Sequence, residues 1–206
     1  METINTIEAL LDHYGEPVDR ALWKEIDHVN DHYRQFIEAS PFCVLATQSE
    51  QGIDLSPRGD PAGFVCVESP TLLYLPDRRG NNRLDSLRNI VANPAVGLIF
   101  FIPTVGETLR VGGTARISID PNLCERFSEQ GKPAKAVLCI DVLKVYFQCQ
   151  KAIVRSGLWE SSTYPAERPV PTAGEMTKYF AQAQAQDFDA EAYDQNYPQH
   201  LKNTLY

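Results

Sequence analysis

The chain has 206 residues, of which 43% are hydrophobic and 22% charged. This balance is typical of one globular domain with appendages. The net charge of −8 argues against nucleic acid or an anionic membrane as the main partner. No window approaches 18 apolar residues, and the acidic N-terminus is too polar for a signal peptide. We therefore expect a cytoplasmic protein without a membrane span.

The first 40 residues are expected to form a helical extension. Apolar residues recur at helical spacing from Ile4 to Ala39, with a break near Gly15 and Pro17. The second part of this segment, from Trp23 to Ile37, is predicted to present one continuous apolar face. We expect the extension to pack across the following domain.

Short β-like runs begin at Phe42 and predict a domain over residues 41–160. Strands are expected at 42–47, 53–59, 64–69 and 71–77, joined as a four-stranded meander, and a helix at 81–91. Further strands are expected at 96–102, 107–119 and 134–149, with Gly112 and Gly113 marking a bulge or a close backbone approach. Short helices are expected at 122–129 and 151–159. Six or seven strands with one intervening helix favour a closed or half-closed antiparallel barrel, which removes exposed strand edges.

Residues 161–206 are rich in Pro, Ala, Gln and Asp and are interpreted as a C-terminal extension. We expect one helix near 175–185 and a looser acidic end. Residues 42–160 hold 13 Lys+Arg against 12 Asp+Glu, so the acidity lies in the two extensions. The central domain is therefore free to hold a local cationic site.

The strongest cationic cluster follows the strand at 71–77. Residues 77–88 contain four arginines against two aspartates. A helix N-terminus, arginine side chains and a glycine that admits close backbone approach together suit a phosphate group. Arg58, in the sequence Ser-Pro-Arg-Gly-Asp, could reach the same phosphate. The alternatives are a solvated capping loop at 78–83 and a tight turn with an internal Arg58–Asp60 ion pair.

Five ordered blocks of sequence resemble a known family. SPRGDPAGF, LYLPDRRGNNRLDSLRNI, NPAVGLIFFIP, ETLRVGGTARI and YFQCQKAIVRSGLW are similar to flavin-binding proteins related to pyridoxamine 5′-phosphate oxidase, in an uncharacterised bacterial branch. The resemblance covers about residues 42–159. It implies a six-stranded antiparallel split β-barrel, mainly β with helical appendages, and a homodimer with FMN bound at the subunit interface.

The resemblance also implies which residues contact FMN. Ser56, Pro57 and Arg58 would line the flavin, and Asn81, Asn82 and Arg83 would hold its phosphate. Thr108 would reach the flavin from the partner subunit. Three further positions fall in a segment that closes the site in relatives: Lys151, Arg155 and Trp159.

Departures from the family limit what the resemblance implies. The Arg-x-Val-Leu-Leu-Lys strand and the substrate-gripping C-terminal segment of true pyridoxamine-phosphate oxidases are absent, which argues against the vitamin B6 reaction. Gln148 stands where close relatives often have His. The expected function is an FMN-dependent oxidoreductase that transfers hydride to or from an unknown small molecule or NAD(P)H. The alternatives are a non-catalytic flavin-binding or sensing protein, or a barrel that holds haem or a deazaflavin. Haem is disfavoured because all four histidines lie outside the predicted barrel.

The remaining reactive side chains predict no separate site. His28 and His32 lie four residues apart on a predicted helix, but two ligands are too few for a metal site. No general acid or base stands out, so no catalytic residue is assigned. The five cysteines form no CxxC pair and are expected to be reduced and mostly buried. Cys149 could be a reactive thiol beside Lys151, but an inert core or interface position is favoured.

Overall fold

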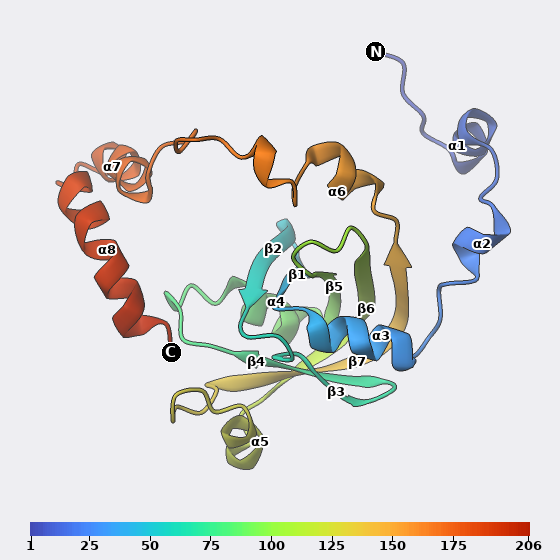
Figure 1. Cartoon of the computed structure of the whole chain (residues 1–206), viewed down its shortest axis with the longest axis horizontal. Helices are drawn as coiled ribbons and strands as arrows, with labels where there is room; N and C mark the ends of the chain where they lie inside the picture. The colour runs from blue at the N-terminus through green and yellow to red at the C-terminus, as the bar shows by residue number, and fades with distance from the viewer.

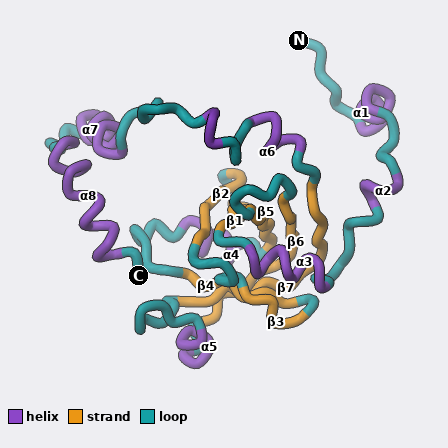
Figure 2. The backbone as a smooth tube through the Cα atoms, viewed as in Figure 1, coloured by secondary structure: helices purple, strands orange, loops and turns teal.

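The computed structural model describes all 206 residues and has a seven-stranded antiparallel sheet that curls into a split barrel (Figures 1 and 2). The strands are β1 (Phe42–Ser49), β2 (Gly52–Gly59), β3 (Cys66–Ser69), β4 (Leu72–Asp77), β5 (Ala95–Phe101), β6 (Thr108–Ser118) and β7 (Ala136–Gln148). The predicted fold class is confirmed, with seven strands instead of six. None of the helices is both long and apolar enough to cross a bilayer.

The strand order is β2-β1-β5-β6-β7-β4-β3, so the predicted four-stranded meander is wrong. β1 and β2 form one hairpin and β3 and β4 another, but the two hairpins stand at opposite ends of the sheet. The connection from Asp60 to Phe64 contains Pro61 and Gly63 and leads the chain from one edge to the other. Local alternation of apolar residues predicts strands but cannot tell which strands pair.

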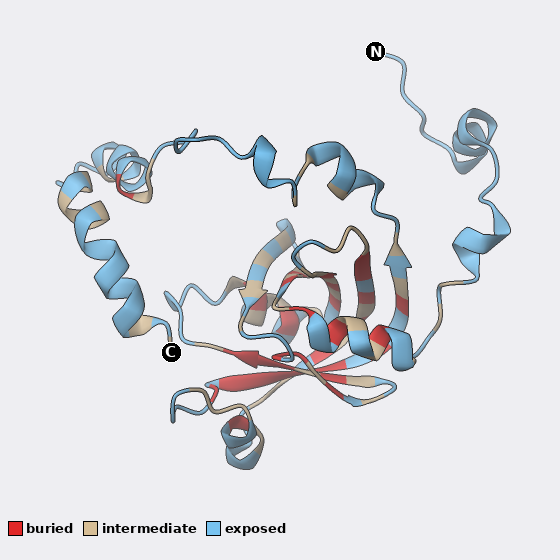
Figure 3. Ribbon diagram, in the orientation of Figure 1, coloured by how far each residue is buried: buried red, intermediate tan, exposed pale blue.

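The core lies on the inner face of the curled sheet (Figure 3). β5 shows the pattern best, because Val96, Leu98 and Phe100 are buried while Gly97 and Ile99 on the outer face are only half-buried. Two helices cover parts of the barrel: α3 (Asp31–Ala39) packs on β3, β6 and β7, and α4 (Asp85–Ala92) packs on β1, β2 and β6.

The predicted bulge at the two glycines of β6 is present. The register with β7 shifts between Gly112 and Gly113. A Cβ atom at Gly113 would lie 2.2 Å from the main-chain oxygen of Asp141, whereas one at Gly112 would meet only the side chain of Lys144, at 3.1 Å. The close approach therefore involves β7 backbone at Gly113 and a flexible side chain at Gly112.

The N-terminal extension is less helical than the sequence suggests. It contains α1 (Ile7–Tyr14) and α2 (Asp19–Leu22), and the predicted helix from Trp23 is interrupted until α3 begins. Ile26 pairs with Val145 at the edge of β7, with N···O distances of 3.1 and 2.7 Å. Asn30 then restarts the helix by accepting a hydrogen bond from the Tyr33 N–H at 2.9 Å. The sheet-edge pairing therefore overrides the helical periodicity of this stretch.

α5 (Pro121–Arg126) lies between β6 and β7. After β7 the chain forms α6 (Lys151–Ser156), a 3-10 turn (Ser161–Thr163), α7 (Ala173–Ala183) and α8 (Ala190–Thr204). The predicted loose acidic end is wrong because α8 forms there, capped by the side chain of Asp189. Figure 1 shows α7 and α8 as an arm that stands apart from the barrel until Tyr206 returns to it.

The cysteines are all free thiols. Cys43, Cys124 and Cys139 are buried, and burial raises the pKa of Cys43 to about 12. Cys66 is half-buried. Cys149 is exposed, so a core position within the single chain is wrong for it: β7 ends at Gln148, and Cys149 follows outside the sheet.

Candidate functional site

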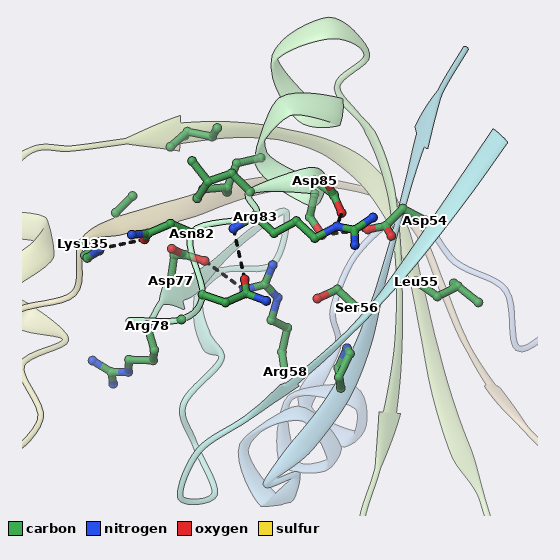
Figure 4. A pocket seen from close by; sticks show the side chains of 18 of the residues that line it. Asp54, Leu55, Ser56, Arg58, Asp77, Arg78, Asn82, Arg83, Asp85 and Lys135 are labelled. Atoms are coloured by element: carbon green, nitrogen blue, oxygen red, sulfur yellow. Dashed lines mark hydrogen bonds and ion pairs between the residues drawn. The ribbon is translucent and has the colours of Figure 1, made fainter. Parts of the chain in front are cut away.

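A cavity of about 560 Å³ opens between β2 and the loop that joins β4 to α4 (Figure 4). We call it the main pocket. Residues 54–58, 77–78, 80–87, 117, 119 and 135–136 line it. Its volume is in the range of small-molecule and cofactor sites. Six of the predicted contact residues share its wall: Ser56, Pro57, Arg58, Asn81, Asn82 and Arg83.

The loop before α4 is shaped by two residues in the left-handed region. Asn82 has φ 58° and Leu84 has φ 63°. Asn81 accepts a hydrogen bond from the Arg83 N–H at 3.1 Å, which closes an Asx turn. These conformations delay the helix to Asp85, so the predicted start at residue 81 is wrong. The three predicted phosphate residues lie in the loop, and the first N–H groups of α4 behind them have no side-chain cap.

Arg58 crosses the gap between the two hairpins. Its Nη1 atom lies 2.9 Å from Oδ1 of Asp77 at the end of β4. Its Nε atom is buried and donates to no acceptor in the chain. The turn-internal Arg58–Asp60 pair is therefore wrong. Sequence reasoning did not single out Asp77, although its position directly before two arginines is a usable signal.

Two other cations of the main pocket, Arg83 and Lys135, are held more loosely than Arg58. Arg83 pairs with Asp85, but its side chain is 78% exposed. Lys135 donates to the Asn82 side-chain oxygen at 3.3 Å. Figure 4 shows Arg58 on one side of the pocket and Asn82 and Arg83 on the other, so donors approach the cavity from two directions.

Asp60 has a different partner, Arg78, whose Nε lies 2.7 Å from Oδ2. The Asp60 carboxylate is almost fully buried and also accepts a hydrogen bond from the Tyr206 hydroxyl at 2.6 Å. This hydrogen bond, with desolvation, raises the pKa of Tyr206 to about 12. The contact joins residues 146 positions apart, so no local signal in the sequence could have revealed it.

The other four predicted residues lie elsewhere in the single chain. Arg155 and Trp159 line a separate cavity of about 470 Å³ beside α6, which shares no residue with the main pocket. Trp159 donates from Nε1 to the Val105 carbonyl at 2.8 Å. Lys151 is exposed at the start of α6, and Thr108 is buried at the start of β6, where it pairs with Gln148.

Several solved structures are similar to parts of this chain. HupZ from Group A Streptococcus is 18% identical, with a TM-score of 0.46 over 57% of this chain and 91% of its own. General Stress Protein 26 from Bacillus anthracis is 18% identical, with a TM-score of 0.43 over 55% of this chain and 88% of its own. A protein related to general stress protein 26, from Clostridium acetobutylicum, is 15% identical, with a TM-score of 0.43 over 57% and 86%.

A comparison with curated proteins finds no match. The family model for pyridoxamine 5′-phosphate oxidase matches residues 29–149. This range is more than half of the chain and contains all seven strands and the main pocket. The protein therefore belongs to the pyridoxamine 5′-phosphate oxidase family.

Proposed function

We propose that the protein is a flavoprotein that binds FMN in the main pocket. The main support for this proposal is that several hydrogen-bond donors around one cavity have no acceptor in the chain. The Arg58 Nε atom is buried and unpaired, and the N-terminus of α4 is uncapped. A phosphate group accepts several hydrogen bonds and is favoured at the positive end of a helix.

The residues around the main pocket fit a phosphomonoester. Arg58 and Arg83 offer guanidinium groups, Asn81 and Asn82 offer side-chain amides, and Gly80 leaves room for close backbone approach. Arg83 is exposed and held only by its neighbour Asp85, so it can exchange this weak surface pair for a dianionic phosphate. Ser56 and Pro57 on β2 would line the flavin ring.

We further propose that the protein is an oxidoreductase with NAD(P)H or a reduced small molecule as its electron donor. FMN, when bound, supplies hydride transfer at its N5 atom, while the chain supplies binding, orientation and electrostatics. A cofactor that performs the chemistry is consistent with a site that is rich in hydrogen-bond donors for a phosphate group and has no assigned catalytic acid or base. The same pocket without turnover would make the protein a flavin carrier or sensor.

The visible spectrum of the purified protein tests these proposals. A flavin spectrum, or saturable uptake of added FMN, is expected. A colourless preparation that takes up no FMN would refute the flavin proposal, and a haem or deazaflavin spectrum would replace it. With FMN bound, NADH or NADPH is expected to bleach the flavin absorbance under anaerobic conditions. Tight FMN binding without reduction by any of a panel of electron donors would favour a non-catalytic flavin sensor.

Replacing Arg83 by alanine is expected to weaken FMN binding. Loss of one charge-assisted hydrogen bond costs about 1.5–3 kcal/mol, which corresponds to roughly 10- to 150-fold in Kd. Fluorescence titration of FMN measures this change. Arg88→Ala is the matched control, because Arg88 is exposed on the helix that follows Arg83 but does not line the pocket. Equal affinity in the two variants would remove Arg83 from the site.

We also propose that two copies of the chain pair through the outer face of the sheet. A shallow apolar cavity of about 370 Å³ lies on this face, lined by residues of β1, β2, β5, β6 and β7. Leu55 lines both this cavity and the main pocket and is 66% exposed. A second copy seated here would lie next to the flavin, where its Thr108, Lys151, Arg155 and Trp159 could complete the site.

Light scattering is expected to give about twice the chain mass of 23.1 kDa. Ile99→Arg places a charge in the outer-face cavity and is expected to yield a monomer with weakened FMN retention, because an unpaired buried charge is strongly unfavourable. Val170→Arg is the control, since Val170 is exposed in the segment before α7. A monomeric wild-type protein at micromolar concentration would contradict the shared site.

A further inference from the structure

A second, smaller cavity of about 150 Å³ lies beside the main pocket. We call it the basic pocket. Its lining combines the end of β4, the loop before β7 and the end of the C-terminal arm: Arg78, Arg79, Lys132, Pro133, Lys135 and Tyr206. Four of these six residues are cationic. Segments far apart in sequence therefore bring positive charge to one small concave site.

Two of these four cations, Arg79 and Lys135, have no carboxylate partner. Arg79 makes no hydrogen bond or ion pair, and Lys135 donates only to the Asn82 amide oxygen. Lys132 donates to the main-chain oxygen of Tyr206 at 2.7 Å. Arg78 is neutralised by Asp60, and Lys132 is engaged by this terminal oxygen. Glu129 is the other nearby acid, close enough to act electrostatically on Tyr206 and so raise its pKa.

The basic pocket is distinct from the part of the main pocket where Arg58 and Arg83 lie. Figure 4 shows Arg78 pointing away from both of these side chains, toward the opposite side of the β4–α4 loop. Arg79, Lys132 and Tyr206 line only the basic pocket, whereas Arg78 and Lys135 line both. The two cavities therefore adjoin but present different sets of donors.

We propose that the basic pocket binds the phosphate or pyrophosphate group of a second small molecule, next to the main pocket. Arg79 and Lys135 have no counter-charge and favour such an anion, and the volume suits a phosphate group but not a whole nucleotide. A phosphate oxygen would take the place of the Tyr206 oxygen that Lys132 now contacts. The rest of the ligand would extend out of the basic pocket, past the rim that Arg78 and Lys135 share with the main pocket.

Isothermal titration with inorganic pyrophosphate tests the site directly, on the full chain and in the presence of excess FMN. Saturable binding at one site per chain is expected. Arg79→Gln and Lys132→Gln should each weaken it by roughly 10- to 100-fold, as the loss of a charge-assisted contact does. Lys178→Gln, on exposed α7, and Arg83→Ala should leave it unchanged.

Three results would overturn the proposal. Absence of saturable binding would exclude an anion site. Competition between FMN and pyrophosphate, or loss of binding in Arg83→Ala, would assign these cations to the main pocket. Equal affinity of Arg79→Gln, Lys132→Gln and the wild-type protein would place pyrophosphate elsewhere. Because pyrophosphate is titrated independently of flavin chemistry, a protein that binds no FMN can still pass this test.

The source of the phosphate is separated by comparing ligands. Adenosine 2′,5′-bisphosphate carries the phosphates of a nicotinamide nucleotide of the NADPH type, and ribose 5-phosphate is a simple phosphomonoester. Tighter binding of the adenosine compound, with the same sensitivity to Lys132→Gln, would identify a nucleotide ligand. Equal affinity would identify a general phosphomonoester site. If Arg79→Gln and Lys132→Gln leave the affinity for both ligands unchanged, the proposal is overturned.

Discussion

Replacing Arg58 by methionine is expected to cause two separate losses. The first is stability, because the Asp77 side chain is only 11% exposed and loses its ion-pair partner. Breaking a buried pair by removing one member costs up to about 3–5 kcal/mol. The second is FMN affinity, which should fall by roughly 10- to 150-fold with the loss of a charged donor. Methionine keeps most of the apolar stem in place.

A double variant separates the two losses. Arg58→Met combined with Asp77→Asn removes the unpaired charge, so the free energy of unfolding should recover most of the way toward wild type. FMN affinity should not recover, because the guanidinium is still missing. Urea denaturation measures the stability, and fluorescence titration measures FMN binding. Recovery of both in the double variant would show that Arg58 acts only as a structural partner of Asp77.

The Arg58–Asp77 pair also explains how the open sheet is held as a barrel. β2 and β3 are the two ends of the strand order and share no ladder. Arg58 on β2 instead reaches Asp77 on β4, and Asp60 after β2 reaches Arg78 after β4. Both bridges stand at the wall of the main pocket. Closing the barrel and shaping the candidate site therefore depend on the same side chains.

The strands and the candidate site could be predicted from the sequence for different reasons. Strands β1 and β5 are short apolar runs bounded by turn residues, which identifies them in the sequence, and the alternation appears only in their burial. The arginine-rich run next to a glycine indicated a phosphate site in the sequence, whereas the individual contact residues between Ser56 and Arg83 came from the family resemblance. Both signals lie within a few consecutive residues.

The features that the sequence could not predict depend on distant contacts. The break before α3 arises because Ile26 pairs with Val145, far along the chain. The positions of β2 and β3 at opposite ends of the sheet depend on pairing partners that no local pattern encodes. Tyr206 joins the Asp60–Arg78 pair only after the whole C-terminal arm has folded back. Each of these required the tertiary structure.

A substitution at the bulge in β6 is expected to lower the free energy of unfolding strongly. Gly113→Ala places a Cβ atom 2.2 Å from the Asp141 carbonyl oxygen, and backbone of the central strand pair must move to admit it. Overpacking of this kind costs about 1–3 kcal/mol. For a chain of this length, each kcal/mol lowers Tm by about 2–4 °C. A clear decrease in Tm is therefore expected by calorimetry.

The neighbouring glycine provides the matched control. Gly112→Ala would contact only the flexible side chain of Lys144, at 3.1 Å, which can rotate away from the sheet. The two variants add the same methyl group to adjacent positions of one strand, so they share any effect of strand propensity. Gly113→Ala should therefore be the less stable variant. Equal Tm values would mean that the close approach of β6 to Asp141 relaxes without cost, and that the bulge does not require glycine.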